Sequence, residues 1–370
     1  MPGSGGENVA LSGRLLTLAV KIVEPMMFRG PGEFTPKARG PQSSAVSQLL
    51  PSPSTFSGML ATALIDSGLA GSPNMGEWHN EIKEVLSSVG IRSVKGPYII
   101  ARIKEKEEIL VQYMDKLVSL TKLYEKPEVL EGEEGEGLNK LEPITPTFTP
   151  KIGIGLDHMR KATKEGLIYT ATMVDYSKLR KTTLENGKEK TVELRPEEVL
   201  IAADIKLENE DAIRRLSNLT LRMGGEGRVV TIKIRDRGGL AQKVAEKISE
   251  LPDNWSGKAI LYIATPLMTR SPPTEPTNWE HTKGGHLYPG APPAKSGRWI
   301  TIKAEPWGAG YRARISARKP VYTMIHPGST IRLEEATKEQ LKNMFEEPEI
   351  LPEQIATYIG YATTIPVPLK

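Results

Sequence analysis

The chain has 370 residues, a formal net charge of +4 at neutral pH and no cysteine. This length is sufficient for two domains of ordinary size. The lack of cysteine excludes disulfides, thiol catalysis and every cysteine-ligated metal site. The net charge is too weak to identify a nucleic-acid-binding protein, so the distribution of charge along the chain has to decide that question.

No apolar run approaches the roughly 20 residues that a membrane-spanning helix requires. The glycine-rich segment 1–8 lacks the basic region and hydrophobic core of a secretory signal. We therefore expect a soluble, cytoplasmic protein that makes no membrane contact. The 29 prolines, the charged content of 25% and the missing cysteine suit a thermophilic source.

The first part of the chain predicts the element order β-α-β-β. Alternating apolar residues indicate a strand over 14–24, which ends at a proline. Helical spacing of apolar residues follows over 54–67 and again over 77–89. A strand pair is expected over 98–103 and 109–113, around a charged turn.

Two hairpins are predicted after an acidic connection. Segment 125–140 has neither the helical nor the strand period, which is typical of a mobile loop. The β-like stretches 151–157 and 166–174 flank the run 158–165, which is too polar to belong to a core. This pattern predicts a projecting hairpin, and the dipeptide Asn186-Gly187 predicts a second hairpin turn.

The remaining part of the chain alternates helices and strands. The segment 271–297 is rich in proline and glycine and is interpreted as a loop. The predicted elements are helix 208–219, strand 229–234, helix 240–251, strand 258–264, a strand pair 298–304 and 311–317, helix 335–345 and a strand-like tail.

These elements predict an α+β fold with two units, each of about four strands and two helices. That composition suits two ferredoxin-like (RRM-like) modules with a projecting β-hairpin and long loop insertions. We place the first domain at 1–200, with the acidic loop and the hairpin. The second domain is placed at 201–370, with the insertion rich in proline and glycine.

The segment 50–60 predicts an anion-binding helix start. A loop stiffened by prolines leads into Ser52, Ser54 and Thr55, and an apolar helical run follows. Hydroxyls and main-chain N–H groups converge at such a start. A helix N-cap alone explains the pattern, and contact with a phosphate is the added hypothesis. An irregular cluster upstream contributes Arg29, Lys37 and Arg39.

The glycine cluster 224–227 matches no nucleotide-binding motif. It lacks the Gly-Lys-Ser/Thr of a P-loop and does not lie between a strand and the helix that it opens. Nucleotide hydrolysis is therefore not supported. One interpretation is a tight turn that needs positive φ. The other is a turn in which Gly225, Gly227 and Arg228 also hold a phosphate, and the two are compatible.

The five histidines form no zinc motif, so we expect no metal and no cofactor. His158 begins the basic hairpin tip. A ribonuclease would use an imidazole placed there to deprotonate a 2′-hydroxyl, while a nearby lysine stabilises the developing charge. The simpler interpretation is a polar residue of an exposed turn that contacts RNA.

The segment 298–332 is predominantly basic, whereas 105–136 is predominantly acidic. Arg312 and Arg314 alternate with small or apolar residues, so we expect one face of a strand to be basic. Solvated charge alone explains this face. Interleaved tyrosine and tryptophan nevertheless favour single-stranded nucleic acid, which needs stacking and phosphate neutralisation. The acidic segment would be repelled from RNA.

Several segments, taken in chain order, carry a family resemblance. In their order and spacing they resemble the RAMP superfamily, specifically the Cas-five-like subunit of type III-B CRISPR (Cmr) complexes that binds the 5′ tag of the guide RNA. The resemblance spans most of the chain. The segments are 25–30, 50–58, 151–157 with 166–169, 224–228, and 319–322 with 327–329.

The resemblance implies two ferredoxin-like domains, a thumb-like hairpin and a noncatalytic subunit that binds crRNA. It implies two protein partners, the large polymerase-like Cmr subunit and a Cmr backbone subunit. Arg29 and the loop 52–55 would hold the repeat-derived tag, and 225–228 would line the same groove. Arg160, Lys161 and Lys164 would lie near the boundary between tag and spacer. The other hairpin residues expected to bind RNA are Lys151, His158 and Tyr169.

The tail departs from the family pattern. RAMP proteins often end in a glycine-rich loop, whereas only Gly360 is found here, so we assign the tail no RNA contact. Two hypotheses from other classes remain. Beside the RNA-binding subunit, they are a metal-independent endoribonuclease that matures the guide RNA, with His158 or His326 as base, and a purely structural bridge between two subunits.

Overall fold

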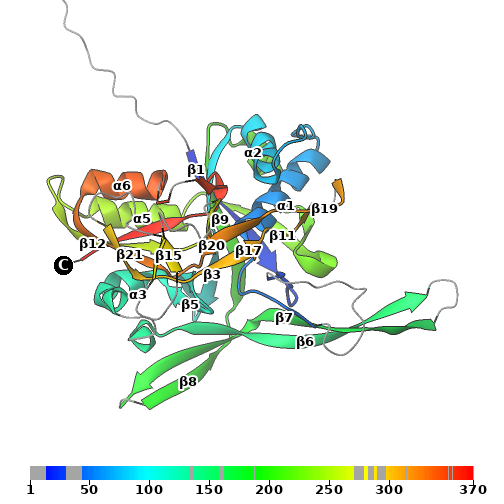
Figure 1. The fold of residues 1–370 in the computed structure, drawn as a ribbon, viewed down its shortest axis with the longest axis horizontal. Coiled ribbons are helices and arrows are strands. Elements are labelled where there is room, and N and C mark those ends of the chain that lie inside the picture. The colour runs from blue at the N-terminus through cyan, green and yellow to red at the C-terminus, as the bar shows by residue number, and fades with distance from the viewer. Residues whose placement is uncertain are drawn as a thin grey trace, which may run out of the picture.

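The computed structural model describes residues 14–30, 44–132, 137–157, 162–186, 188–270, 279–281, 287–289, 297–312, 315–348, 350–351 and 353–369. Within this part the fold is mixed α/β and dominated by sheets (Figure 1). None of its helices is long and apolar enough to cross a bilayer. The candidate residues outside the described part are Lys37, Arg39, His158, Arg160, Lys161 and Arg314.

Most N-terminal strands join one large sheet. Among the described residues this sheet has 12 strands, two of which, β23 (Ile359–Gly360) and β8 (Lys188–Leu194), pair at its side with β3 and β7. The others, in spatial order, are β10 (Thr220–Met223), β11 (Arg228–Arg235), β1 (Arg14–Ile22), β9 (Glu198–Leu207), β3 (Ile91–Ile103), β4 (Lys106–Tyr113), β5 (Lys116–Ser119), β6 (Ile144–Asp157), β7 (Ala162–Glu185) and β2 (Ser44–Val46).

Four strands at the centre of the sheet follow a simple plan. Their spatial order is β11-β1-β9-β3, and every neighbouring pair is antiparallel. The helices α1 (Pro53–Asp66) and α2 (Trp78–Ser88) connect β1 to β3. The short α4 (Asp211–Arg215) follows β9, and the strands β4 to β8 form an insertion between β3 and β9.

A second sheet repeats this order in the C-terminal part. Its strands are arranged β16-β21-β12-β24, again antiparallel throughout. The helix α6 (Lys338–Glu346) connects β21 to β24, and α5 (Leu240–Ser249) precedes β12. The strand bounds are β12 (Ser256–Ile263), β16 (Gly297–Thr301), β21 (Thr330–Thr337) and β24 (Thr364–Pro368).

A smaller sheet and two ribbons complete the C-terminal part. The smaller sheet has the order β17-β20-β13-β22, and the ribbons are β14-β15 and β18-β19. The bounds are β13 (Leu267–Thr269), β14 (Trp279–His281), β15 (Leu287–Pro289), β17 (Ala304–Gly308), β18 (Tyr311–Arg312), β19 (Ala317–Arg318), β20 (Val321–Ile325) and β22 (Gln354–Ile355).

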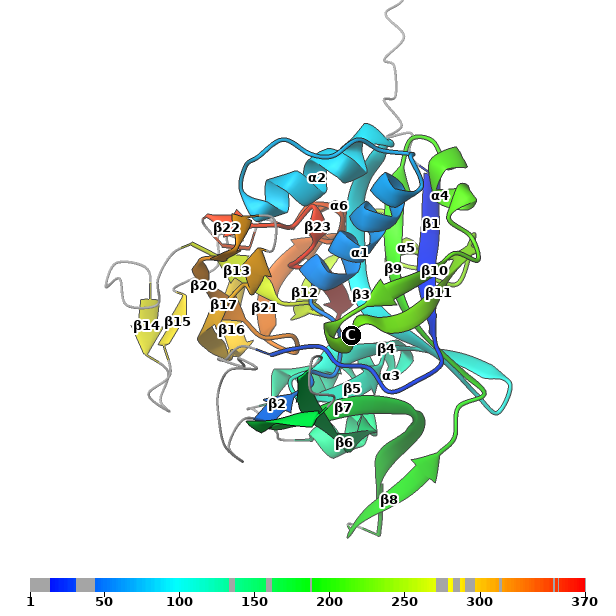
Figure 2. The same cartoon turned by 90° about the vertical axis from the view of Figure 1, so that its right-hand side faces the viewer.

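The helices cover opposite faces of the large sheet (Figure 2). Leu16 and Leu18 of β1 pack with Phe56 of α1. The alternate residue Ala19 faces the other side, where Val244 of α5 belongs to the same buried cluster. Because both faces are covered at the middle of β1, Thr17 and Ala19 are buried as well as Leu16 and Leu18, which explains why its alternation in the sequence is imperfect.

A buried carboxylate joins the large sheet to the start of α5. Asp204 of β9 accepts hydrogen bonds from the hydroxyls of Thr17 (2.6 Å) and Tyr98 (2.8 Å) and from the main-chain N–H of Ala241 (2.5 Å). The side chain is fully buried, and burial raises the pKa of Asp204 to about 6. Gly239 leaves it room, because a Cβ there would lie 2.0 Å from the carboxylate.

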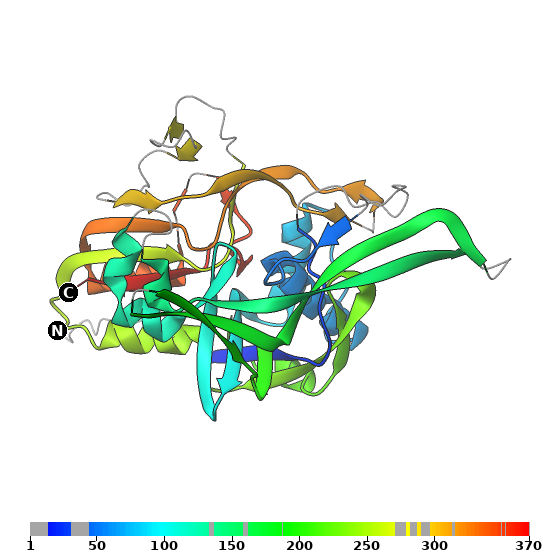
Figure 3. The same ribbon diagram turned by 90° about the horizontal axis from the view of Figure 1, so that it is seen from below.

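The strand β7 takes part in two hairpins that extend in different directions (Figures 1 and 3). With β6 it forms the predicted projecting hairpin, paired as far as Asp157 and Ala162. With β8 it forms the hairpin whose turn contains Asn186, at a φ of 52°. Both arms are longer than the sequence pattern indicated, because paired polar residues continue each ribbon beyond the apolar stretches.

Three expectations need correction. The expected domain boundary, between 1–200 and 201–370, falls inside β9, and β10 and β11 still pair within the large sheet, so the chain does not divide there. The acidic connection contains the 3-10 helices η1 (Pro127–Glu131) and η2 (Leu138–Leu141), preceded by α3 (Leu120–Glu125), and Leu130 and Leu141 anchor it in the core. The C-terminal strand pair does not form: β16 pairs with β21, and β18 pairs with β19.

Candidate nucleic-acid interface

The start of α1 has the hydroxyl cluster that the sequence predicts. Ser52 is the N-cap, and its side-chain oxygen accepts a hydrogen bond from the Thr55 N–H at 3.2 Å. Its Oγ also lies 3.0 Å from Ser54 Oγ and 3.0 Å from Thr55 Oγ1. Pro53 at the first helical position has the φ that a helix requires and lacks the N–H that would be left unpaired. Three hydroxyls therefore meet at the positive end of the helix dipole.

The C-terminal tail packs against the start of α1 and hydrogen-bonds to it. Tyr361, only 2% exposed, donates its hydroxyl to Ser54 Oγ at 3.1 Å, and burial raises its pKa. Gly360 has a φ of +104°, and a Cβ there would lie 2.4 Å from the Gly96 carbonyl oxygen. The tail thus positions α1, a role that the sequence analysis did not predict.

The segment 26–30 lies beside the approach to α1. The Gln48 N–H donates to the Phe28 carbonyl at 2.7 Å, and the Phe28 N–H donates to Ser47 Oγ at 2.9 Å. Ser47 also forms an isolated antiparallel β-bridge with Arg29, and its N–H donates to the Thr172 carbonyl of β7 at 3.0 Å. Arg29 is exposed. The cluster around Arg29, the loop before α1 and the base of the hairpin are therefore neighbours.

The glycine turn packs against the same segment. Gly224 has a φ of +76°, and a Cβ there would lie 2.5 Å from the Met27 carbonyl oxygen. This geometry confirms the prediction of a tight turn that needs positive φ; Gly227, at +57°, also has positive φ. The Gly225 N–H donates to the Met27 carbonyl at 2.7 Å. That amide is consequently already engaged within the protein.

Arg228 is held by a carboxylate. Its guanidinium donates to Glu24 at 2.6 Å, and the Val229 N–H donates to the same carboxylate at 3.2 Å. The Val229 hydrogen bond and the Arg228 pair lower the pKa of Glu24, and the positive charge of Lys151 contributes. Lys151 is exposed and lies opposite Ala171 in the hairpin ladder. Lys151 and Arg228 therefore lie near the same acid at the hairpin base.

The remaining predicted residues lie farther along two ribbons. Lys164 and Tyr169 belong to β7, where Tyr169 pairs with Gly153. Arg312 belongs to β18 and pairs with Ala317 of β19. The segment 311–317 is thus not one continuous strand, because the chain turns at Ser316, which has a φ of 50°. The alternation that suggested one basic face has no strand to support it there.

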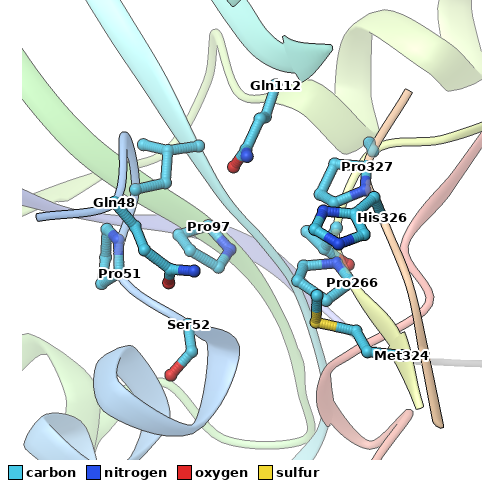
Figure 4. Close-up of a pocket in the computed structure, with 12 residues that line it drawn as sticks. Gln48, Pro51, Ser52, Pro97, Gln112, Pro266, Met324, His326 and Pro327 are labelled. Atoms are coloured by element: carbon cyan, nitrogen blue, oxygen red, sulfur yellow. The ribbon is translucent and has the colours of Figure 1, made fainter. Parts of the chain in front are cut away.

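A pocket close to Ser52 was not predicted (Figure 4). Gln48 and Ser52 line one side, and His326 and Pro327 line the other. His326 Nε2 lies 2.8 Å from Glu305 Oε1, and burial lowers the pKa of His326 although Glu305 opposes the shift. No sequence signal marks Gln48, because its place in the pocket depends on the residues that the fold brings opposite it. In the described part of the chain, no group of three or more His, Asp or Glu side chains is arranged to hold a metal.

Comparisons with known proteins identify the family of the chain. Residues 120–365 match the family described as "CRISPR-associated protein (Cas_Cmr3)", which is more than half of the chain. The chain is 25% identical over 224 residues to the CRISPR system CMR subunit Cmr3 of Saccharolobus solfataricus. That match covers 59% of this chain and 62% of the relative, so it spans less than two thirds of the relative's length.

Two solved structures share the fold. One is a chain of a type III-B Cmr-beta complex bound to cognate target RNA and AMPPnP, with a TM-score of 0.53, 17% identity and coverage of 90% of this chain and 89% of that one. The other comes from the same kind of complex bound to cognate target RNA, with a TM-score of 0.54, 19% identity and coverage of 85% and 86%. With the family match, these observations place the chain in the CRISPR-associated Cmr3 family.

Proposed function

We propose that the chain is a noncatalytic RNA-binding subunit of a type III-B Cmr complex in CRISPR defence, and that it holds the repeat-derived 5′ tag of the crRNA. The main support is that three predicted features lie around one surface. Ser47 connects the Arg29 segment to the base of the hairpin, and the hydroxyls of 52–55 follow a few residues later in the same loop. They come from separate parts of the sequence, and buried side chains beneath them, Phe28, Leu50 and Val174, belong to one hydrophobic cluster.

The strand orders support two ferredoxin-like modules. Such a module has the order 4-1-3-2 in an antiparallel sheet, with helices after its first and third strands. The order β11-β1-β9-β3 fits this plan, with the hairpin strands inserted between the second and third strands. The order β24-β12-β21-β16 fits it again, with α6 after the third strand. We accordingly place the boundary between the modules after β11.

The tag would run from the start of α1 across the base of the hairpin. Arg29 and Lys151 are exposed there and supply positive charge for phosphates. Arg228 is paired with Glu24, so its contribution to phosphate neutralisation should be smaller. The projecting hairpin, with Lys164 and Tyr169 on one arm, would separate the tag from the guide sequence. The large polymerase-like subunit and a backbone subunit are the proposed protein partners.

A salt titration of RNA binding tests this proposal. Full-length protein should bind tagged RNA, and replacing Arg160, Lys161 and Lys164 together by Ala should weaken binding. The slope of log affinity against log salt should fall by about 2, since each phosphate contact on a single strand contributes about 0.7. The matched control replaces three exposed lysines away from the hairpin, Lys243, Lys247 and Lys258, and should leave the slope unchanged.

Single substitutions should rank the contacts. Arg29→Ala and Lys151→Ala should each weaken binding, whereas the double variant Glu24→Gln with Arg228→Ala, which removes both charges of the ion pair, should have little effect. The RNA should also remain uncut without metal. Cleavage that disappears in His158→Ala or His326→Ala would instead establish the endoribonuclease hypothesis. Equal slopes for the hairpin triple variant and its control would remove the hairpin from the RNA path.

A further inference from the structure

Two consecutive residues that follow the glycine turn 224–227 bind the same carboxylate. Glu24 Oε2 accepts a hydrogen bond from Arg228 Nη1 at 2.6 Å, and Glu24 Oε1 accepts one from the Val229 N–H at 3.2 Å. Both oxygens of Glu24 are therefore engaged, one by a guanidinium and the other by a main-chain amide. The turn positions these two donors together, because Arg228 comes directly after it.

The groups around Glu24 have the chemistry of an anion site. A guanidinium, a main-chain N–H and a lysine are donors that proteins commonly direct at phosphate. The hydrogen bond from Val229, the Arg228 pair and the positive charge of Lys151 lower the pKa of Glu24, against the opposing effect of burial. A carboxylate offers one negative charge and two acceptor oxygens, so Glu24 occupies this site in the manner of a phosphate edge.

Other residues tie the site to the base of the projecting hairpin. Arg228 Nη2 lies 3.3 Å from the sulfur of Met173 in β7, and Lys151 belongs to β6. Arg29 lies against the same turn, since a Cβ on Gly225 would be 3.5 Å from Arg29 Nε. Three cations therefore lie around the turn and the hairpin base, and Glu24 neutralises one of them.

The ion pair is accessible to a competing anion. The side chain of Glu24 is 32% exposed and that of Arg228 is 20% exposed. Among the described residues, Glu24 is the one carboxylate that pairs with Arg228. A partly exposed ion pair contributes little to stability, so its exchange for another anion has a small cost. Displacement of Glu24 would make the charge of Arg228 available.

We propose that Glu24 occupies a phosphate site of the RNA path and that an RNA phosphate displaces it on binding. This inference rests on the proposed function, because it takes single-stranded RNA to pass the base of the hairpin. Glu24 is then an internal competitor, which holds Arg228 in position in the free protein and lowers the affinity for RNA. Since one anion replaces another, Arg228 contacts RNA in the wild type without adding to the salt dependence of binding.

Removal of the carboxylate tests the exchange. Full-length Glu24→Gln is titrated with tagged RNA at several salt concentrations, and fluorescence anisotropy gives the dissociation constant. The variant should bind about fivefold more tightly at low salt, which is the size of one exposed ion pair. The slope of log affinity against log salt should steepen by about 0.7, for one additional phosphate on a single strand.

A matched control separates the site from the overall charge. Glu246→Gln changes the net charge by the same amount and breaks an exposed ion pair with Lys243 on α5. It should leave the slope of the wild type unchanged. The double variant Glu24→Gln with Arg228→Ala should also return to the wild-type slope, because Arg228 is the cation that Glu24 releases. A steeper slope that persists in the double variant would show that the exchange is wrong.

A second substitution guards against misfolding. If Glu24→Gln lowers the unfolding temperature, Glu24→Met replaces it, since methionine has a similar length and no charge, and the same tighter binding is expected. If the wild type binds tagged RNA and the folded variant binds it with unchanged affinity and slope, the exchange is wrong and the proposed function stands. If neither protein binds tagged RNA, alone or in the assembled complex, both are wrong.

Discussion

At the scale of single residues, two carboxylates have opposite environments. Glu24 is partly exposed and is stabilised as an anion by the Val229 N–H and Arg228, so its pKa is lowered. Asp204 is fully buried and has no cation among its hydrogen-bond partners, so its pKa is raised to about 6. Glu24 thereby reduces the positive charge that Arg228 presents at the surface. Asp204 makes the joint between β9 and α5 sensitive to pH.

Asp204→Asn should reveal this sensitivity. The unfolded carboxyl has a pKa of about 3.9, whereas the folded value is about 6. Since the folded chain favours the protonated acid, this stabilising contribution is present in full below pH of about 4 and is lost as the pH rises through about 6. The stability of wild type relative to Asp204→Asn should fall by up to about 3 kcal/mol across that window.

Denaturant unfolding at several pH values between 4.5 and 7.5 measures this difference. Groups common to both proteins cancel, so the difference isolates Asp204. A difference that stays constant, or one that grows as the pH rises, would show that Asp204 is not held as the structure indicates.

At the scale of elements, α1 is positioned by the tail of the chain. The helix has its own start signals in Ser52 and Pro53. Its place in the molecule depends on Tyr361 and on the close approach of Gly360 to Gly96. The element that presents the candidate phosphate contacts is therefore supported by residues about 300 positions away in the sequence.

Gly360→Ala should damage this support. Alanine at this position would have to adopt the strained φ of +104°, and its Cβ would lie 2.4 Å from the Gly96 carbonyl oxygen. We therefore expect a loss of at least about 3 kcal/mol in unfolding free energy. Gly71→Ala is the control, because nothing lies within 4 Å of its Cβ and its φ is ordinary. Thermal unfolding and RNA affinity should both fall for Gly360→Ala alone. Equal behaviour of the two variants would contradict the role of the tail.

At the scale of the whole molecule, the two strand systems share a hydrophobic core. One buried cluster contains Ala19 and Ile100 of the large sheet together with Val244 of α5 and Ile260 of β12. The buried Lys95 of β3 also donates to the Glu346 carbonyl at the end of α6, at 2.8 Å. Each module therefore completes the core of the other.

Scanning calorimetry should accordingly show one unfolding transition, with a calorimetric enthalpy close to the van't Hoff enthalpy. A fragment 14–235 should expose the apolar face that α5 covers and should bind the dye ANS strongly. Two resolved transitions, or a fragment with cooperative unfolding and no dye binding, would show that the modules fold independently.

Local patterns were sufficient for much of the fold. The helices α1, α2, α5 and α6 were predicted within a few residues, because each has regular apolar spacing. The segments 298–304 and 311–317 were paired with each other incorrectly, because β16 and β17 find partners farther along the chain and β18 pairs with the adjacent β19. The acidic connection was misread because its anchors, Leu130 and Leu141, are too sparse to form a period.

The sequence by itself determined the class of the protein. Segment order carried the resemblance to its family, and local chemistry determined the N-cap at Ser52, the glycine turn at 224–227 and the hairpin that includes β6. Only the tertiary structure decided which of these groups meet. It paired Arg228 with Glu24, placed Tyr361 beneath Ser54 and closed a neutral pocket between Gln48 and His326. The physical reason is that a helix cap or a turn is fixed by neighbouring residues, whereas a charge pair or a pocket depends on distant strands packing together.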